Sequence, residues 1–429
     1  MVKTLEKVKN EKVKSMPLGS ILSVNARRTP ENEALRFDGK SISYAALNAK
    51  VNILANALRG EGLNKGDKVA LIIQNSDRII VSYFAALKLG CVVVPISNSF
   101  SAREIQQIIN ITDSKMVIFD PRDAQLIFAI KTKLKPVEKF LPLGKIPAQK
   151  RTDKYLDWNT LLLDTSLNEP GIEVNQWDDC QILYTSGVKT NLLGALFDHQ
   201  RITAAAVNMI AILGINRADK ILHLAPLAHH ASLNLFLLSG IYVGAHNILV
   251  KHSNPPDIQE VISIMEKEKI NIVFGFIDLF DIFMQIFMQL QNKYLVDLSD
   301  LVCCFYGASP VDPKKYRIFL DHSGDAQVYN LTLYTEMGPG GFYLPPEDQI
   351  RKAGSIGVAF PNTEARVVDE RQVDISPGMV GELIFRGETM MKGYFNNLRV
   401  TEMKIKNSWL HTGQQATISE EGDIQTTGR

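Results

Sequence analysis

Apolar and polar positions along the chain follow two periods, and each period predicts a different kind of element. Between residues 47 and 58, leucine and valine recur at spacings of four, three and four, which predicts an amphipathic helix that ends at Gly60. Ser101-Ala-Arg-Glu104 is a capping-box pattern that opens a further helix. Uninterrupted apolar runs at 69–73 and 91–96 are typical of strands buried on both faces. Strands and helices that alternate at this pace predict a parallel, doubly wound sheet.

The same alternation continues through the middle of the chain. Helices are predicted at 204–213 and 258–265, and strands at 221–224, 270–274 and 301–305. We therefore expect a second, mostly parallel sheet with its own flanking helices.

The pattern changes beyond Ser355, where short apolar runs at 365–369 and 381–386 are separated by turn-rich connections. This predicts a smaller antiparallel, barrel-like subdomain beside two doubly wound, mostly parallel sheets, within an α/β fold. Residues 133–178, rich in proline and lysine, indicate a surface connection. The expected ranges, approximate and interleaved, are a flexible lead-in at 1–20, α/β subdomains at 21–180 and 181–350, and the antiparallel subdomain at 351–429.

Composition narrows the classes of partner. At 429 residues the chain is too long for one ordinary core, and its 45% hydrophobic and 22% charged residues are ordinary for a globular protein. The 47 basic residues nearly balance the 46 acidic ones, so charge gives no case for a nucleic-acid partner.

The cysteines and the apolar stretches indicate the cellular compartment of the protein. Cys91, Cys180, Cys303 and Cys304 lack metal-ligand spacing, so we expect reduced thiols in the core. The first fifteen residues lack the apolar stretch of a signal peptide. Residues 231–250 are interrupted by glycine, asparagine and histidine, which favours a buried helix and strand over a membrane span. A cytoplasmic protein is predicted.

Residues 182–199 read ILYTSGVKTNLLGALFDH and have the outline of a nucleotide phosphate loop. An apolar run ends at Tyr184, the small residues Thr185-Ser186-Gly187 follow, and the loop closes on Gly194. A strand that leads into a small-residue turn is how proteins aim backbone N–H groups at phosphates. Residues 188–193 do not fit that role, because they contain a β-branched valine and two leucines.

Separated blocks of this sequence resemble, in the right order, the AMP-forming adenylating enzymes: acyl-CoA synthetases, peptide-synthetase adenylation domains and luciferases. The resemblance runs from about residue 20 to the end of the chain. The blocks are Ser43–Asn48, Lys65–Val69, Leu89–Pro95, Tyr184–Gly187, Tyr306–Pro310, Thr335–Gly341, Pro345–Asp348, Gly354–Gly357, Gly381–Leu383 and Trp409–Gly413. The Pro-Gly-Gly at 339–341 and Pro-Pro-Glu-Asp at 345–348 resemble fatty acyl-CoA synthetases more than amino-acid-activating domains.

The resemblance implies the large N-terminal domain of an enzyme that joins a carboxylate to the α-phosphate of ATP and passes the acyl group to a thiol. ATP or AMP, Mg²⁺ and coenzyme A or another thiol are the implied cofactors. Thr335 and Glu336 would serve the α-phosphate and Mg²⁺, and His229 would gate the acyl pocket. The implied nucleotide-binding residues are Thr185, Ser186, Gly187, Lys189, Gly194, Gly307, Ala308, Ser309, Tyr334, Gln414 and Arg429. The implied acyl-pocket residues are His229, His230, Phe276, Gly307, Met337 and Gly338.

An apolar pocket would select a fatty or aryl acid, because a charged amine would be left unpaired there. A small-molecule carboxylic acid is therefore the expected partner. A homodimer stays open.

This chain departs from the family in four places. The family loop Thr-Ser-Gly-Thr-Thr-Gly-x-Pro-Lys-Gly is altered at 188–193, where Lys189 is the remaining candidate cation. Gln414 stands where the family has an aspartate that binds the ribose hydroxyls. A neutral glutamine there would lose the charge-assisted part of the hydrogen bond to ribose. The aromatic residue that stacks on adenine is displaced, to Tyr334 or Tyr329. Gly428-Arg429 resembles the last residues before the family's hinge, so we expect the small C-terminal domain to be missing.

Each of these residues also has a purely structural interpretation. Thr185 and Ser186 can end a strand with satisfied hydroxyls, a histidine at 229 can be a core residue, and Arg429 can be frayed. Three functions therefore stay open: an acyl-CoA synthetase-like domain with a weakened ATP site, a non-catalytic relative that binds an acyl group, a nucleotide or a partner protein, and a competent ligase whose C-terminal domain lies outside this chain.

Overall fold

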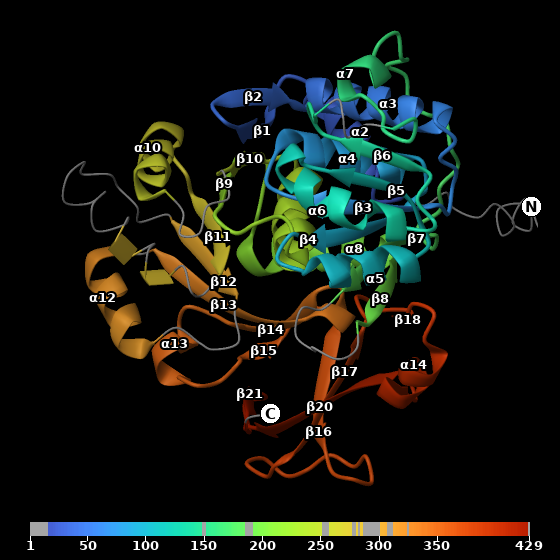
Figure 1. The fold of residues 1–429 in the computed structure, drawn as a ribbon. Helices are drawn as coiled ribbons and strands as arrows, with labels where there is room; N and C mark the ends of the chain where they lie inside the picture. The colour runs from blue at the N-terminus through green and yellow to red at the C-terminus, as the bar shows by residue number, and fades with distance from the viewer. Residues whose placement is uncertain are drawn as a thin grey trace, which may run out of the picture.

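The structure is a computed structural model that describes residues 16–147, 152–184, 192–250, 257–276, 280–281, 284–285, 301–306, 312–323 and 326–427. Within these residues the strands form sheets of seven, nine and five strands (Figure 1). The five-stranded sheet lies below the two larger ones in Figure 1, and the chain ends beside it.

The seven-stranded sheet has the order β18-β8-β7-β4-β3-β5-β6. Its strands are β3 (Lys68–Ile73), β4 (Val92–Ser97), β5 (Ser114–Phe119), β6 (Lys139–Pro142), β7 (Asp179–Tyr184), β8 (Gly194–Asp198) and β18 (Gly393–Tyr394). The strands from β7 to β6 pair in parallel, whereas β8 pairs antiparallel with β7 and β18 antiparallel with β8. The predicted parallel sheet is confirmed, with two antiparallel strands at one edge.

Helices cover both faces of this sheet, which is why the central strands β3 and β4 are apolar along most of their length. Val69 and Leu71 of β3 face a core shared with α3 and α4, whereas Ala70 and Ile72 face a core shared with α5 and α6. The helices and helical turns around it are α3 (Tyr44–Gly60), α4 (Asp77–Lys88), α5 (Ala102–Ile111), η1 (Pro121–Asp123), α6 (Ala124–Ile130), η2 (Lys131–Lys133), α7 (Trp158–Leu161) and α8 (His199–Leu213).

Local sequence signals begin α5 and end α3 as predicted. Ser101 and Glu104 form the capping box: the Glu104 N–H donates to Ser101 Oγ at 3.3 Å, and the Ser101 N–H donates to Glu104 Oε2 at 2.7 Å. The apolar stripe predicted at 47–58 is fully buried along α3, and α3 ends at Gly60.

The nine-stranded sheet has the order β15-β14-β13-β12-β11-β9-β10-β1-β2 and is parallel from β13 to β1. Its strands are β1 (Glu33–Phe37), β2 (Lys40–Ser43), β9 (Lys220–His223), β10 (His246–Leu249), β11 (Ile272–Phe276), β12 (Val302–Tyr306), β13 (Gln327–Tyr334), β14 (Gly340–Leu344) and β15 (Val358–Ala359). Helical segments in this part are α2 (Ser20–Arg28), the π-helical turn η4 (Ser232–Leu237), α9 (Leu238–Val243), α10 (Ile258–Glu268), α12 (Pro313–Ser323), η7 (Thr335–Met337) and α13 (Asp348–Arg351). The second predicted sheet is confirmed.

The five-stranded sheet is antiparallel, as predicted for the C-terminal part. Its strands are β16 (Thr363–Val368), β17 (Gly381–Gly387), β19 (Ile405–Lys406), β20 (Trp409–Ile418) and β21 (Ile424–Thr426), and α14 (Leu398–Lys404) precedes β19. The guanidinium groups of Arg366 and Arg386 both lie over the indole of Trp409, at 5.1 and 4.5 Å from the ring centroid.

The connection predicted at 133–178 contains two elements that the sequence did not reveal, β6 and α7. β6 ends in proline and is an edge strand that follows a lysine-rich stretch, so its apolar run is too short to stand out. The sheets also interleave along the chain, since β1 and β2 join the nine-stranded sheet and β18 joins the seven-stranded one. The ranges 21–180, 181–350 and 351–429 stay a prediction about domains.

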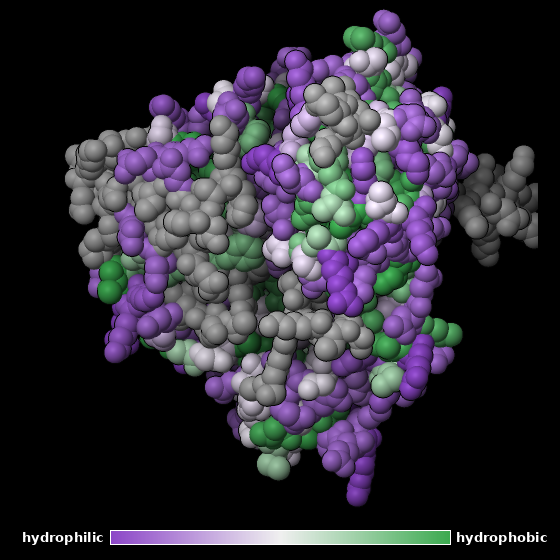
Figure 2. Space-filling view, viewed as in Figure 1, coloured by the Kyte–Doolittle hydropathy of each residue, from purple (hydrophilic) through white to green (hydrophobic). Residues whose placement is uncertain are grey.

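The remaining expectations concern the surface and the thiols. All four cysteines are free and buried. Residues 231–250 form helical segments followed by β10, and no helix in the described part of the chain is long and apolar enough to cross a membrane. Hydrophilic residues make up most of the described surface on the face in Figure 2, where hydrophobic residues form small groups.

Candidate functional site

Glu336 lies at the carboxyl end of β13, where the chain reverses into β14. The helical turn η7 carries Thr335 and Glu336, and Gly338 follows with a φ of +92°. A Cβ on Gly338 would lie 2.7 Å from the carbonyl oxygen of Thr389, so only glycine fits this turn. Carboxyl ends of parallel strands are where α/β proteins bind ligands, so this turn is well placed for a site.

Tyr394 is the hydrogen-bond partner of Glu336. Its hydroxyl donates to Glu336 Oε1 at 2.8 Å, and the Met391 N–H donates to the Glu336 carbonyl at 2.7 Å. Burial raises the pKa of Tyr394 far above its usual range, and the neighbouring carboxylate adds to this shift, so the phenol is a neutral donor. Tyr394 was not predicted from the sequence, where the one signal for it is an aromatic residue directly after Gly393 in a turn-rich region.

Thr335 connects the Glu336 turn to two histidines. Its hydroxyl is hydrogen-bonded to His230 Nε2 at 3.2 Å, and the rings of His229 and His230 stack with centroids 4.1 Å apart. His229 in turn meets the ring of Phe276 edge-on at 5.4 Å. Burial lowers the pKa of His229 to about 4 and holds that of His230 well below its usual range, so both rings are neutral at pH 7.

The predicted pocket residues His229, His230 and Phe276 line one cavity of about 280 Å³. The cavity lies at the carboxyl ends of β4 and β7. Its other lining residues are Pro95, Ser97, Asn98, Ser99, Phe100, Leu183, Tyr184, Pro226 and Ala228. Met337 and Gly338 are buried beside Glu336 and do not line this cavity, and Gly307 lies outside the described residues.

Gly194 closes the hairpin between β7 and β8, directly opposite Tyr184. A Cβ here would lie 2.6 Å from Ile182 Cγ2 and 2.8 Å from the Tyr184 ring, which requires glycine. Leu192 and Leu193 pack against the two hydrophobic cores on either face of the sheet. They therefore contribute apolar contacts in place of a cation. Thr185, Ser186, Gly187 and Lys189 lie outside the described residues.

Tyr334 and Gln414, two of the predicted nucleotide-binding residues, are in direct contact. Tyr334, at the end of β13, donates its hydroxyl to Gln414 Oε1 at 2.6 Å, and its ring packs edge-on against Phe385 at 4.9 Å. The amide oxygen that would accept a ribose hydroxyl is therefore engaged by a tyrosine. Tyr329, the other candidate for adenine, donates to Gln327 on its own strand at 3.4 Å. Ala308, Ser309 and Arg429 lie outside the described residues.

The residues around Glu336 fit a Mg²⁺ ion that is carried in with a nucleotide. Among the described residues, no group of three His, Cys, Asp or Glu side chains could hold a metal by itself. Mg²⁺ needs no such group, because it keeps several waters and is bound through one or two carboxylates and the substrate's phosphates. The half-buried Glu336 supplies one such carboxylate.

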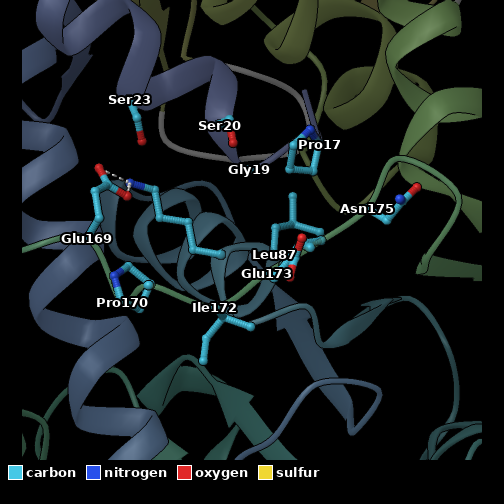
Figure 3. A pocket seen from close by; sticks show the side chains of 13 residues that line it. Pro17, Gly19, Ser20, Ser23, Leu87, Glu169, Pro170, Ile172, Glu173 and Asn175 are labelled. Atoms are coloured by element: carbon cyan, nitrogen blue, oxygen red, sulfur yellow. Dashed lines mark hydrogen bonds and ion pairs between the residues drawn. The ribbon is translucent and has the colours of Figure 1, made fainter. Parts of the chain in front are cut away.

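A second cavity of about 280 Å³ lies where α2, α4 and the connection 169–175 meet (Figure 3). Lys88 reaches this junction from α4, and its ammonium donates to Asn48 at 2.6 Å, Asn52 at 2.7 Å and Glu169 at 2.8 Å. An ammonium has three N–H donors, so the protein uses them all. Burial lowers the pKa of Lys88, and the carboxylate of Glu169 opposes that shift. The Lys88–Glu169 ion pair holds the connection that leads into β7 against α4 and has a structural role.

Comparison with known proteins agrees with this geometry. The chain is 27% identical over 419 residues to a feruloyl-CoA synthase of Amycolatopsis sp, covering 97% of this chain and 79% of that protein. It is 27% identical over 388 residues to the long-chain-fatty-acid–CoA ligase FadD13 of Mycobacterium tuberculosis, covering 90% of this chain and 73% of that protein. The crystal structure of the N-terminal domain of FACL13 from Mycobacterium tuberculosis superposes with a TM-score of 0.84 at 26% identity, over 96% of this chain and 100% of that one. The model of the AMP-binding enzyme family matches residues 22–395, and the chain belongs to that family.

Proposed function

We propose that this chain is the adenylate-forming domain of an acid–thiol ligase that activates an apolar carboxylic acid, fatty or aryl, with ATP. The observation that carries the proposal is the hydrogen bond between Thr335 and His230. It joins the turn that bears Glu336 to the wall of the cavity that would hold the acid. A carboxylate and an α-phosphate must meet for this reaction, and a single hydrogen bond links the two places that would hold them.

The proposed chemistry is attack of a carboxylate oxygen on the α-phosphorus, with cleavage of the bond to pyrophosphate. Both reactants are anions, so the site must offset charge and orient the acid. Glu336 would hold Mg²⁺, which would supply positive charge to offset the charge of the phosphates. The Thr335 hydroxyl, oriented by His230, would donate to an α-phosphate oxygen. The acyl group would then pass to coenzyme A or another thiol.

The cavity supports an apolar acid as the substrate. Its lining is largely apolar and aromatic, and its two histidines are neutral at pH 7 because burial lowers the pKa of each. A substrate amine would find no carboxylate among the described lining residues and would lose its hydration without compensation. FadD13 and feruloyl-CoA synthase are named for a long-chain fatty acid and an aryl acid, and either class suits this lining.

We further propose that this chain binds ATP more weakly than relatives with a regular phosphate loop. Leu192 and Leu193 are partly buried against the hydrophobic cores, and the oxygen of Gln414 accepts from Tyr334. This last contact also favours a second candidate function, a non-catalytic protein that binds the acyl group alone. In that case the Tyr334–Gln414 bond would keep the ribose position occupied by protein.

Two measurements separate these candidates. Calorimetric titration with ATP and Mg²⁺ measures nucleotide affinity, and ATP–pyrophosphate exchange in the presence of fatty or aryl acids measures adenylate formation. Micromolar ATP binding with acid-dependent exchange supports the ligase. Binding of the acid alone, with neither ATP binding nor exchange, supports the non-catalytic candidate and refutes the ligase.

A further inference from the structure

One short segment, residues 390–395, contacts both halves of the candidate nucleotide site. On one side the Met391 N–H donates to the Glu336 carbonyl at 2.7 Å. On the other side the Lys392 N–H donates to Leu196 at 2.8 Å, and the Phe395 N–H donates to Gly194 at 2.7 Å. Gly194 is the residue on which the predicted phosphate loop closes. The segment therefore bridges the loop's exit and the metal-binding candidate through backbone bonds alone.

Side chains of the same segment also form hydrogen bonds and an ion pair with the residues around it. Tyr394, which lies in β18 opposite Ala195, donates its hydroxyl to Glu336 Oε1 at 2.8 Å. Its N–H donates to Thr401 Oγ1 at 2.8 Å. Arg201 Nε donates to the Met390 carbonyl at 2.7 Å, and Lys392 forms an ion pair with Asp179 of β7. The segment is thus bound to helix α8 at its Met390 end, and to strands β7 and β8 of the sheet that carries the loop through Lys392 and Phe395.

We propose that residues 390–395 form a splint, a segment that holds the Glu336 carboxylate in a fixed position relative to the exit of the phosphate loop. Tyr394 is the positioning residue of this splint. The proposal rests on the proposed function, because the position of Glu336 relative to the loop exit matters only if a nucleotide and its metal ion bind to both. Tyr394 acts through Glu336 and is not itself a ligand.

The expected size of the effect follows from the behaviour of metal sites in general. A carboxylate that binds a metal is oriented by the hydrogen bonds its other lone pairs accept, and removing such a partner typically lowers metal affinity or activity by about 10–100-fold. The Tyr394 phenol is a suitable partner, since its hydroxyl donates directly to Glu336 Oε1 at 2.8 Å. Without Tyr394, the Glu336 carboxylate would lose the hydrogen bond that orients it.

The direct test replaces Tyr394 by phenylalanine and measures Mn²⁺ binding in the presence of ATP by electron paramagnetic resonance. Tyr394→Phe should weaken Mn²⁺·ATP binding by about tenfold or more. The matched control is Tyr155→Phe, because the Tyr155 hydroxyl is buried and has no hydrogen-bond partner among the described residues. This control should bind Mn²⁺·ATP with unchanged affinity.

A double-mutant cycle shows whether Tyr394 works through Glu336. In a Glu336→Gln background, adding Tyr394→Phe should change Mn²⁺·ATP affinity by less than about twofold, because the carboxylate it positions is gone. Equal losses in both backgrounds would overturn the positioning role and leave Tyr394 a structural residue.

A second pair of variants tests the splint without touching Tyr394. Thr401→Val removes the acceptor of the Tyr394 N–H and should also weaken binding, whereas Thr401→Ser keeps that acceptor and should not. Wild-type protein that binds no Mn²⁺·ATP would overturn the proposed function together with the splint. Normal wild-type binding with unchanged affinity in both Tyr394→Phe and Thr401→Val would overturn the splint alone.

Discussion

Replacing Gln414 by aspartate should strengthen nucleotide binding. Gln414 Oε1 already accepts the Tyr334 hydroxyl at 2.6 Å, so it has limited capacity for a ribose hydroxyl. An aspartate presents two charged oxygens and is one methylene shorter. It can accept from Tyr334 or water with one oxygen and from ribose with the other.

The magnitude follows from the difference between neutral and charged hydrogen bonds. A neutral hydrogen bond contributes about 0.5–1.5 kcal/mol net and one to a charged group about 1.5–3 kcal/mol. The gain is therefore about 1 kcal/mol for each ribose hydroxyl, or about 2 kcal/mol for two. Residue 414 is half-buried, and water screens about half of that gain, which leaves about 1 kcal/mol or a fivefold increase in affinity.

The assay is calorimetric titration with adenosine, AMP and ATP·Mg²⁺, with Gln414→Asn as the matched control. Asparagine has the length of aspartate without its charge, so it should give no gain. The same titration with 2′,3′-dideoxyadenosine should show no difference between Gln414→Asp and wild type, because the ligand lacks both hydroxyls. An equal gain with asparagine, or an equal gain with the dideoxy compound, would refute the reasoning.

Three further predictions concern the loop, the buried histidines and the Lys88 junction. Val188→Thr combined with Leu193→Lys should raise ATP affinity in calorimetry, because it restores a donor and a cation; an unchanged affinity would show that side chains are not what limits the loop. Burial lowers the pKa of His199, His223 and His229 to about 4, so the unfolded chain binds protons at a higher pH than the folded chain does. The melting temperature should therefore fall as the pH is lowered from about 6.5 to 4. His199→Phe should make this fall less steep, and a fall as steep as that of the wild type would contradict the prediction. In urea unfolding, Glu169→Leu should lower the free energy of unfolding by about 2 kcal/mol, because it leaves the buried Lys88 ammonium, whose side chain is 4% exposed, without its carboxylate. Lys88→Met should lower it less, because the Glu169 side chain is 46% exposed and its charge stays hydrated. The reverse order would contradict the assignment of Lys88 as the buried partner.

Elements whose signals are local could be predicted from the sequence. The apolar stripe of α3, the capping box of Ser101 and Glu104, and the apolar runs of β3 and β4 depend on residues a few positions apart, and the structure contains all of them. β6 was missed because an edge strand of four residues ending in proline gives a weak period.

The site could be predicted only in part, because its contacts join distant positions. Tyr394 and Glu336 are 58 residues apart, and Thr335 and His230 are 105 apart. The resemblance to adenylating enzymes singled out the adjacent pair Thr335 and Glu336, and His230 separately, and it gave no reason to connect Thr335 with His230. Tyr394 escaped notice because β18 is a strand of two residues, too short to give a periodic signal, and the long-range pairing of β18 with β8 brings it to the carboxylate.

The central claim is that one continuous site holds an apolar acid beside an adenine nucleotide, joined at the Thr335–His230 bond. It is tested most directly by calorimetric titration with a stable acyl-adenylate mimic, compared with the matching acid and with AMP. A ligand that spans both places should bind at least about 100-fold more tightly than either part, because the second half binds as an intramolecular event. A mimic that binds no more tightly than the acid alone would contradict the account.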